Sequence, residues 1–376
     1  MKVGKNHPPL YVEFVDNQWV AFVGAKRFIV KIMIVRGQAT VVKHTGSHYM
    51  LSVLPKWELF PAVLRGKIRL KGSTATNPVA VGDVVDFEAD IPEGGEQGPG
   101  VAAESVTSEN PAVITAVHPR RNYIIRKSTN LSRQSHIIAA NLDRAFLVVT
   151  LDFPQVKLPF LDRLLVTCEV YNVPAVIVLN KCDLYGPEHE DMRTAFHEIY
   201  EGAGYPVIEV SAHTGEGVDR LRDIVSGKIL ADGTSNEDYD PSRPYVSLFS
   251  GVSGVGKSSL IKALDPSLEP RVGEISDAHE QGRHTTTFYE MYSLASGGFI
   301  VDTPGLRGFG LVDLKKEEIA LYFPEMLQAA QNCRFAPCTH THEPGCAVKE
   351  AVENGEISYD RYSSYLGMLD EEGKYR

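Results

Sequence analysis

The hydrophobic and polar positions along the chain follow two different periods. From about residue 34 to 117, short runs such as GQATVVKHTG and VGDVVDFEA alternate apolar and polar residues, and turns that contain glycine separate them. This period of two is typical of half-buried β-strands. From about residue 141 to 323, apolar runs such as RAFLVVTL and PAVIVLN alternate with helical stretches at 188–201 and 217–226. Buried strands followed by crossover helices predict a mostly parallel sheet.

These patterns predict a multidomain protein with three folded parts. We expect an N-terminal OB-type β-barrel, a central α/β domain, and a mainly helical C-terminal domain around a cluster of Cys and His residues. The predicted boundaries are 34–118 for the barrel, 119–325 for the α/β domain and 326–376 for the C-terminal domain. Residues 1–33 remain as an N-terminal extension of unknown role.

One stretch of the expected barrel, RGKIRLKG, carries basic residues at every second position. In a strand, this spacing brings all four to one face, because side chains alternate between the two faces. A basic face on an OB-type barrel favours RNA binding. The alternative is a solvent-exposed edge strand whose charges prevent pairing with another chain. The predicted RNA-binding residues are Arg65, Lys67, Arg69 and Lys71.

The distribution of charge matters more than its total. A net charge of −10 disfavours a nucleic-acid partner if the charge is spread evenly. However, residues 1–71 contain twelve Lys or Arg and three acids, whereas residues 72–118 contain eight acids and no Lys or Arg. A local positive surface can therefore bind phosphates although the whole chain is acidic.

The N-terminal composition and the cysteines indicate a cytoplasmic protein with no membrane partner. The longest apolar stretch near the start, RFIVKIMIV, is interrupted by Lys31 and is too short to span a bilayer. Glu13 and Asp16, and the absence of serine before Ser47, disfavour a signal or transit peptide. The five cysteines are an odd number, and three of them lie between 333 and 346, which favours a reduced compartment and a metal site.

The segment GVSGVGKS matches the phosphate-binding pattern G-x-x-x-x-G-K-[ST] and lies between an apolar strand and an amphipathic segment. Its backbone N–H groups would surround phosphate oxygens, Lys257 would contact the β- and γ-phosphates, and the Ser258 hydroxyl would bind Mg²⁺. The segment DTPG, which ends the strand GFIV, would add Asp302 for Mg²⁺ and the Gly305 N–H for the γ-phosphate. The predicted residues of the phosphate loop are Gly251, Val252, Ser253, Gly254, Val255, Gly256, Lys257, Ser258 and Ser259.

Two further segments would select the base. NKCD follows an apolar strand, and the Asp183 carboxylate can accept hydrogen bonds from both N1–H and the exocyclic amine of guanine, a donor pair that adenine lacks. Asn180 would bridge the base and the neighbouring loops, and the stem of Lys181 would cover the ring. SAHTG, which begins with Ser211, would meet the guanine carbonyl oxygen through the Ala212 N–H. Together the two segments predict GTP and GDP as ligands.

The base-selecting segments precede the phosphate loop in the chain, which reverses the order found in Ras-like GTPases. This order predicts a circularly permuted P-loop GTPase domain, because new termini are tolerated where the chain ends lie close together at the surface. The permutation places DTPG near the end of the domain, shortly before the Cys and His cluster.

The cluster CRFAPCTHTHEPGC predicts one structural zinc site. Cys333, Cys338, His340 and Cys346 supply three thiolates and one imidazole, a complete tetrahedral set with no open position for catalysis. His342 is the competing imidazole ligand. The remaining two cysteines are expected to have structural roles, one in an apolar helix and one in a loop.

The polar segment HEQGRHTTTFYE, between the phosphate loop and DTPG, suits a mobile switch. One of Thr285, Thr286 or Thr287 should reach Mg²⁺ when GTP is bound, and we choose Thr286. Leu306 follows DTPG, where Ras-type GTPases soon carry a glutamine that orients the attacking water, and a leucine cannot orient a water. His284 is the candidate catalytic residue in its place; the alternative for His284 is a solvated loop histidine.

The combination of these segments resembles the RsgA family, also called the YjeQ family, of bacterial circularly permuted GTPases. The resemblance rests on GVSGVGKSS, GRHTTT, DTPGLRGFGL, the Cys and His cluster, EPGCAVKEAVENGEI and RGKIRLKGSTATNPVAVGD, and it covers the chain from about residue 33 to the end. It implies a role in late maturation of the small (30S) ribosomal subunit. It further implies that the OB and zinc domains bind 16S ribosomal RNA and that the ribosomal particle stimulates GTP hydrolysis.

Several alternatives remain open from the sequence. The leading interpretation is a GTP hydrolase, and a GTP-binding RNA assembly scaffold with little hydrolysis competes with it. Leu306 favours the scaffold, whereas Ser258, Asp302 and His284, a set suited to Mg²⁺ and water, favour the enzyme. A metabolic P-loop kinase would not need NKCD and SAHTG. The linker 231–244 looks longer than is usual in the family, and residues 1–32 have no counterpart there, so Met33 is either the true start or the first residue after a lineage-specific arm. No feature indicates an oligomer, and we expect a monomer.

Overall fold

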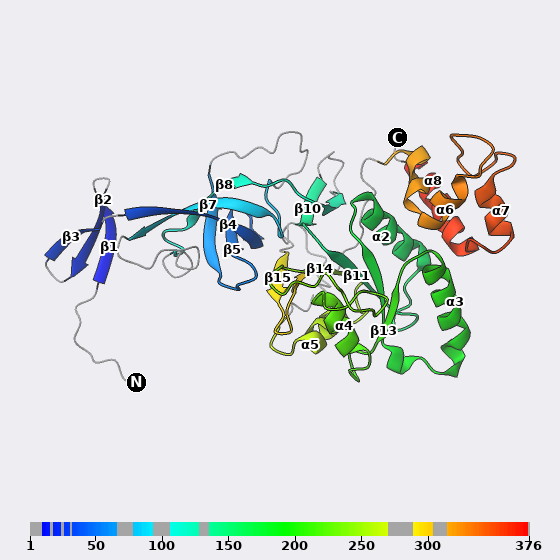
Figure 1. Cartoon of the computed structure of the whole chain (residues 1–376), viewed down its shortest axis with the longest axis horizontal. Helices are drawn as coiled ribbons and strands as arrows, with labels where there is room; N and C mark the ends of the chain where they lie inside the picture. The colour runs from blue at the N-terminus through cyan, green and yellow to red at the C-terminus, as the bar shows by residue number, and fades with distance from the viewer. Residues whose placement is uncertain are drawn as a thin grey trace, which may run out of the picture. The chain divides into compact units, whose positions relative to one another are not determined.

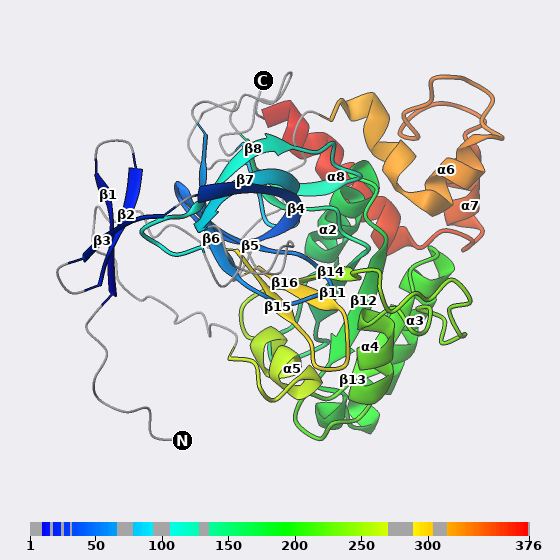
Figure 2. The same ribbon diagram turned by 60° about the vertical axis from the view of Figure 1, so that its left-hand side comes forward.

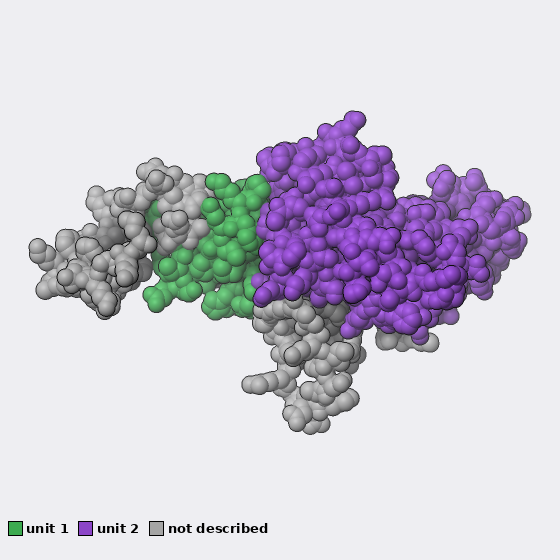
Figure 3. Space-filling model, turned by 90° about the horizontal axis from the view of Figure 1, so that it is seen from below, with its two compact units in different colours: residues 1–69, 84–118 green, residues 70–83, 119–376 purple. Residues whose placement is uncertain are grey.

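The computed structural model describes residues 10–15, 18–23, 26–30, 32–65, 78–92, 106–127, 135–269, 289–303 and 314–374 (Figure 1). The chain forms two compact units (Figure 3). The first comprises residues 1–69 and 84–118, and the second comprises residues 70–83 and 119–376.

The first unit contains a five-stranded β-barrel, as the alternating pattern predicted. Its strands are hydrogen-bonded in the order β4-β5-β6-β8-β7, and a further antiparallel pairing of β4 with β7 closes the barrel. Inward-facing side chains such as Leu51, Phe60 and Phe87 are at most 1% exposed and form its core. The strands are β4 (Ile32–Thr45), β5 (His48–Ser52), β6 (Phe60–Leu64), β7 (Val84–Pro92) and β8 (Ala112–Val117).

The N-terminal segment, for which the sequence suggested no structure, contains a small antiparallel sheet. Its strands are β1 (Leu10–Val15), β2 (Gln18–Val23) and β3 (Lys26–Val30). Among the described strands, these three pair only with one another. The barrel strand β4 begins directly afterwards, at Ile32, which pairs with Pro92 of β7.

The second unit contains the predicted parallel sheet, in the strand order β13-β12-β11-β14-β16-β15. Neighbouring strands are parallel except β15, which runs antiparallel to β16. Their central residues are almost all buried, as expected for a sheet covered on both faces. The strands are β11 (Arg144–Val149), β12 (Ala175–Asn180), β13 (Val207–Val210), β14 (Val246–Ser250), β15 (Glu290–Ser293) and β16 (Phe299–Asp302).

Helices cover both faces of this sheet. Helices α4 and α5 lie side by side (Figure 2) and bury Leu221 and Leu260 against Phe146, Val178 and Phe249 of the strands. Because side chains alternate along β11, its odd-numbered residues point to the opposite face, where α2 contacts the strand. The helices are α2 (Leu158–Val170), η1 (Cys182–Leu184), η2 (Pro187–His189), α3 (Glu190–Gly202), α4 (Val218–Val225) and α5 (Lys257–Leu264).

The strand order explains how the reversed sequence order still gives one site. Strand β14, which precedes the phosphate loop, lies between β11, which comes earlier in the chain, and β16, which comes later. Because β12, β13, β14 and β16 are parallel, the segments that follow them all begin at the same edge of the sheet. NKCD, SAHTG, the phosphate loop and DTPG therefore meet there, as the permutation hypothesis requires.

The C-terminal helices pack against the α/β part of the second unit (orange to red in Figure 1). Their core contains Phe323, Met326 and Tyr365, together with Val166 of α2. The elements are η3 (Lys316–Tyr322), α6 (Pro324–Ala330), α7 (Ala347–Glu353) and α8 (Tyr359–Lys374). No helix in the described part of the chain is long and apolar enough to cross a membrane.

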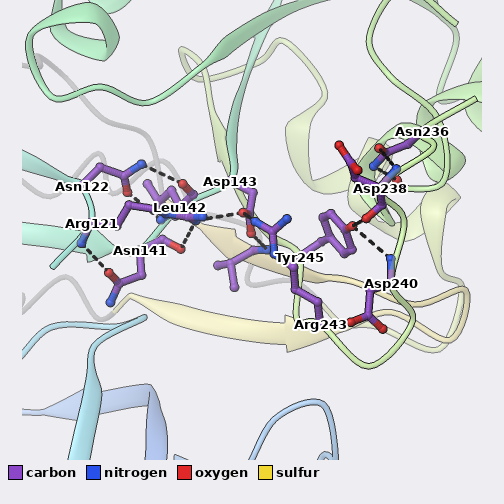
Figure 4. Close-up of polar contacts among 12 residues, drawn as sticks. Arg121, Asn122, Asn141, Leu142, Asp143, Asn236, Asp238, Asp240, Arg243 and Tyr245 are labelled. Atoms are coloured by element: carbon purple, nitrogen blue, oxygen red, sulfur yellow. Dashed lines mark hydrogen bonds and ion pairs between the residues drawn. The ribbon is translucent and has the colours of Figure 1, made fainter. Parts of the chain in front are cut away.

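The linker 231–244 is folded onto the amino-terminal edge of the sheet. Figure 4 shows Asp143 between Arg121 and Arg243, both of which form ion pairs with its carboxylate. The Val246 N–H donates a hydrogen bond of 2.8 Å to the same carboxylate, and the Arg243 guanidinium lies 4.8 Å from the ring centre of Tyr245. The long linker is thus held at its end by a network of charges around one aspartate.

A short β-ribbon precedes the sheet. It consists of β9 (Tyr123–Lys127) and β10 (Ser135–Ala140), paired antiparallel. Close to it, Arg120 donates two hydrogen bonds, of 2.6 and 2.7 Å, to the fully buried carboxylate of Asp83. This bidentate pair joins the segment 78–83 to the start of the ribbon.

Candidate guanine nucleotide site and zinc centre

The phosphate loop connects β14 to α5, and its glycines are explained by close contacts. A Cβ atom on Gly251 would clash with the Val148 carbonyl oxygen of β11, and one on Gly256 would lie 2.5 Å from Asn180 Nδ2. Gly254 and Gly256 have φ angles of 89° and 87°, which disfavour any other residue. The loop therefore needs glycine to fit against β11 and against Asn180, the first residue of NKCD.

Lys257, the first residue of α5, forms a buried ion pair at this edge. Its ammonium group contacts the Asp302 carboxylate and donates a hydrogen bond of 2.6 Å to the Thr303 carbonyl oxygen. Lys257 is 8% exposed and Asp302 is 4% exposed. The structure thus brings together the two charged residues that the sequence assigned to phosphate and to Mg²⁺. Ser258 follows directly and is partly exposed.

Asn180, at the end of β12, connects three of the predicted loops. Its Nδ2 donates to the Val255 carbonyl oxygen of the phosphate loop at 2.8 Å, and its Oδ1 accepts from the Ala212 N–H of SAHTG at 3.1 Å. The side chain is 1% exposed, so both hydrogen bonds are shielded from water. Asn180 therefore fixes the base-selecting segments relative to the phosphate loop, as the sequence suggested.

Asp183 lies exposed beside SAHTG, where a base could reach it. One carboxylate oxygen accepts a hydrogen bond of 2.5 Å from the Ser211 hydroxyl. The same hydroxyl accepts from the N–H groups of His213 and Thr214 at 3.2 and 3.0 Å. Ser211 thereby orients the carboxylate and shapes its own loop. The neighbouring Cys182 is a neutral thiol, because burial and then the Glu216 carboxylate raise its pKa to about 11.

One part of the site was not predicted from the sequence. The ammonium group of Lys181 donates to the Gly254 carbonyl oxygen at 2.8 Å and also to the Phe153 carbonyl oxygen. Phe153 belongs to the loop that follows β11, and no motif marks that loop. The only sequence signal was its place, since it follows a strand of the parallel sheet at the edge where the other loops meet.

Several predicted residues lie outside the described residues. These are Lys67, Arg69, Lys71, His284, Thr285, Thr286, Thr287, Gly305 and Leu306. Of the predicted RNA-binding residues, Arg65 is described: it is exposed and lies 2.9 Å from the Glu88 carboxylate, which also accepts a hydrogen bond of 2.9 Å from Arg36. The catalytic, Mg²⁺-binding and RNA-binding roles of these predicted residues, including that of Arg65, stay predictions.

The four predicted zinc ligands come together in the C-terminal helical region. The ligand atoms of Cys333, Cys338, His340 and Cys346 all lie within 4.8 Å of one another. His340 Nδ1 is 3.4 Å from Cys346 Sγ and 3.7 Å from Cys333 Sγ, and the two sulfurs are 4.0 Å apart. Tetrahedral zinc with ordinary bond lengths would separate sulfurs by about 3.8 Å and sulfur from nitrogen by about 3.6 Å. The residues present therefore fit a zinc ion.

The loop that carries these ligands is held by hydrogen bonds around it. The Glu343 carboxylate accepts from the hydroxyl and the N–H of Thr339 at 2.6 and 2.8 Å. Tyr362 and Tyr365 of α8 donate to the carbonyl oxygens of His340 and Thr339, each at 2.6 Å. His342 is exposed, and its ring contacts the Thr341 hydroxyl, so the structure places His340 and not His342 beside the cysteines.

The fold and these loops define the class of protein: a circularly permuted P-loop GTPase with an N-terminal OB-type barrel and a C-terminal Cys₃His centre. Proteins called small ribosomal subunit biogenesis GTPase RsgA are similar to this chain. The one from Bacteroides fragilis is 45% identical over 338 residues, which cover 89% of this chain and 98% of that protein. The one from Porphyromonas gingivalis is 43% identical over 339 residues, which cover 89% and 97%. The chain belongs to the RsgA GTPase family, and it is a GTPase.

The family model and two solved structures add detail. The RsgA GTPase model matches residues 117–233 and 241–312, so its match is interrupted inside the linker 231–244. The crystal structure of YjeQ from Thermotoga maritima superposes with a TM-score of 0.68 at 31% identity and covers 91% of this chain and 100% of that chain. YloQ, described as a circularly permuted GTPase, shares the fold with a TM-score of 0.62 at 24% identity, covering 91% and 96%.

Proposed function

We propose that this GTPase acts as a late maturation factor of the small (30S) ribosomal subunit and binds 16S ribosomal RNA through its OB barrel and its C-terminal domain. The observation that carries the proposal is the likeness to relatives named for small ribosomal subunit biogenesis, which extends over nearly their whole length. We further propose a cytoplasmic monomer with domain boundaries at residues 34–118, 119–325 and 326–376.

In this proposal, guanine nucleotide binds at the edge where the four loops meet. Asp183 accepts hydrogen bonds from the base, Lys181 covers it, and the Ala212 N–H meets its carbonyl oxygen. The phosphates lie on the backbone of residues 251–259, at the start of α5, where N–H groups without helical partners favour anions. Lys257 exchanges its contact with Asp302 for the β- and γ-phosphates, and Ser258 and Asp302 hold the Mg²⁺ that neutralises them.

Zinc has a structural role in the proposal. Three thiolates and His340 would complete its coordination, and the tyrosines of α8 already hold the backbone of the ligand loop in place. One zinc per chain would therefore order the C-terminal domain and present it to RNA.

Hydrolysis is proposed to depend on the ribosomal particle. Leu306 cannot orient water, so the missing contribution comes from His284, from Thr286 and its Mg²⁺, and from contacts that the subunit makes with the switch segment. Binding to RNA is assigned to the basic stretch from Arg65 to Lys71, where phosphates of the RNA backbone would meet alternating charges.

The test is GTP turnover by the purified protein, alone and with small ribosomal subunits, with ATP as the control nucleotide. A rise of roughly 10–10³-fold with subunits and GTP, and none with ATP, is the expected result, below the ceiling for activation by an arginine finger. Unchanged turnover with tight GTP binding would reject subunit-stimulated hydrolysis and favour a GTP-binding assembly scaffold.

A further inference from the structure

The hydroxyl of Tyr185 joins two loops of the nucleotide edge. Tyr185 lies two residues after Asp183, and its side chain turns back toward the end of β12. The hydroxyl donates a hydrogen bond of 2.6 Å to the Asn180 carbonyl oxygen and accepts one of 3.0 Å from the Leu151 N–H. One side chain of the base-selecting segment is therefore anchored both to its own strand and to the loop after β11.

The loop that Tyr185 contacts, residues 150–156, is closed by its own hydrogen bonds. The Thr150 hydroxyl donates to the Pro154 carbonyl oxygen at 2.5 Å, and the Val156 N–H donates to the Thr150 carbonyl oxygen at 3.1 Å. Thr150 is 2% exposed, so its hydroxyl acts inside the protein and not at the surface. The loop is thus a fixed support to which other segments can be attached.

This support also contacts Lys181 and the phosphate loop. The Phe153 carbonyl oxygen accepts a hydrogen bond from the Lys181 ammonium group, which also donates to Gly254 at 2.8 Å. Gly254 lies against Pro154, because a Cβ atom there would be 3.3 Å from Pro154 Cδ. The loop 150–156 therefore holds both ends of the segment 181–185 and touches the phosphate loop as well.

The environment of Tyr185 keeps its hydroxyl protonated, so that it can donate one hydrogen bond and accept another. Burial raises the pKa of Tyr185 to about 12, so the group stays protonated at neutral pH and can donate to Asn180 while accepting from Leu151. Its ring packs against the ring of His189 at 5.5 Å between centroids, which limits its rotation.

From these contacts we infer that Tyr185 is a positioning residue for guanine recognition: it fixes the segment that carries Lys181 and Asp183 against the loop 150–156. The inference rests on the proposed role of Asp183 as the acceptor for the base. Recognition of the exocyclic amine of guanine needs a carboxylate at one fixed place, since a hydrogen bond weakens steeply when its geometry is lost. A loosened segment should therefore lose affinity for guanine more than for a base without that amine.

The experiment measures the affinities of the full chain for GDP and for inosine diphosphate, which lacks the exocyclic amine. Tyr185→Phe keeps the ring and removes the hydroxyl; Thr150→Val keeps the shape and opens the supporting loop. For both variants we expect about tenfold weaker GDP binding, the range of one to two lost hydrogen bonds, and a loss of about threefold or less for inosine diphosphate. Tyr205→Phe, which removes a hydroxyl bound to Glu169 away from the site, is the matched control and should bind both nucleotides normally.

Two results would overturn the inference: a GDP affinity of Tyr185→Phe and Thr150→Val within twofold of the unaltered protein, or equal losses for the two nucleotides. Thermal unfolding shows whether each variant is folded. If either Tyr185→Phe or Thr150→Val does not fold, the nucleotide affinities of the other one test the inference. Asp183→Ala is measured in parallel to separate the inference from its premise. If Asp183→Ala leaves the preference for GDP intact, the assignment of the base site is wrong; if it removes that preference while Tyr185→Phe does not, the role of Tyr185 alone is wrong.

Discussion

Lys257 and Asp302 form a buried ion pair, and the sequence assigned Lys257 to the phosphates and Asp302 to Mg²⁺. Both are less than a tenth exposed, so removing one leaves the other charge buried without a partner. We expect Lys257→Met to abolish detectable nucleotide binding and to lower the free energy of unfolding by about 3–5 kcal/mol. Denaturant unfolding and nucleotide titration check this. In the double variant Lys257→Met with Asp302→Asn, stability should return in part while binding does not; full recovery of binding would remove Lys257 from the phosphate site.

Asp183 is exposed and oriented by Ser211, which makes its chemistry testable by a substitution of equal size. In Asp183→Asn, the amide can donate a hydrogen bond to the C2 carbonyl oxygen of xanthine but can no longer accept the donor pair of guanine. We expect GTP affinity to fall by a factor of up to about 10⁴ and xanthosine triphosphate to bind better than GTP. Competition binding measures both. Asp191→Asn on the exposed face of α3 is the control, and a variant of Asp183 that still prefers GTP would contradict the assignment.

At the scale of residues, sequence reasoning predicted site residues only where they lie in contiguous motifs. The roles predicted for Lys257, Asn180 and Asp183 follow from short patterns whose geometry is local to one strand and the turn after it. The contributions of Phe153 and Tyr185 depend on contacts between residues 28 and 34 positions apart in the chain. No periodicity or motif encodes those contacts, so they could be found only in the folded chain.

Among the structural elements, the loop between α6 and α7 carries the four residues that could hold a metal ion. Its three thiols and His340 are drawn together at distances that suit zinc. We expect one zinc per chain, and we expect a strong chelator to lower the Tm, by about 2–4 °C for each kcal/mol lost if the large second unit unfolds as a whole. Metal analysis and thermal unfolding measure both. Cys338→Ser should lose the zinc and His342→Ala should keep it. Loss of zinc from His342→Ala would show that His342 is a ligand.

Helix α8 is attached to the α/β domain through Arg361, which is 1% exposed. Its guanidinium contacts the carboxylates of Asp162 in α2 and Glu325 in α6 at 2.8 Å each and lies 4.6 Å from the ring centre of Phe323. Burial raises the pKa of Asp162 although Arg361 opposes the rise. The C-terminal helices are therefore held to the GTPase domain by ion pairs that are largely shielded from water.

Replacing Arg361 by methionine should separate these elements, because two carboxylates would remain buried without a cation. We expect Arg361→Met to lower the free energy of unfolding by about 3–5 kcal/mol, and adding Asp162→Asn to recover part of the loss. Denaturant unfolding checks both variants. Arg220→Met, at an exposed position of α4, is the control and should change stability by about 0.5 kcal/mol or less; an equally small effect at Arg361 would mean that the helices are held by apolar packing alone.

The sequence predicted the helices and strands and their order better than it predicted the side-chain contacts that join them. The parallel sheet, the barrel and the C-terminal helices were predicted because apolar spacing reports which face of each element is buried. The attachment of α8 through Arg361 could not be predicted, since an arginine in an amphipathic helix is ordinarily solvated. The contact of the linker 231–244 with Asp143 could not be predicted for a similar reason, because the polar composition of the linker is typical of an exposed loop.

The charge of the whole molecule is distributed unevenly along the chain. The net charge is −10, yet residues 1–71 carry twelve basic residues and three acids. At physiological ionic strength, charges interact over about 8 Å, so a phosphate near the basic stretch is little affected by distant acids. Arg65 is already paired with Glu88, which leaves Lys67, Arg69 and Lys71 as the residues assigned to RNA phosphates.

Reversal of these three charges, Lys67→Glu, Arg69→Glu and Lys71→Glu, should weaken binding to the small ribosomal subunit and reduce its dependence on salt. Each lost phosphate contact reduces the magnitude of the slope of log affinity against log salt by about 0.7–0.9, so three should reduce it by roughly 2–3. The matched control reverses Arg220, Lys228 and Lys262, which are exposed on the GTPase domain and give the same change in net charge. Binding measured at several salt concentrations distinguishes the sets. Equal slopes for both variants would mean that overall charge governs association and that the basic stretch makes no phosphate contacts of its own.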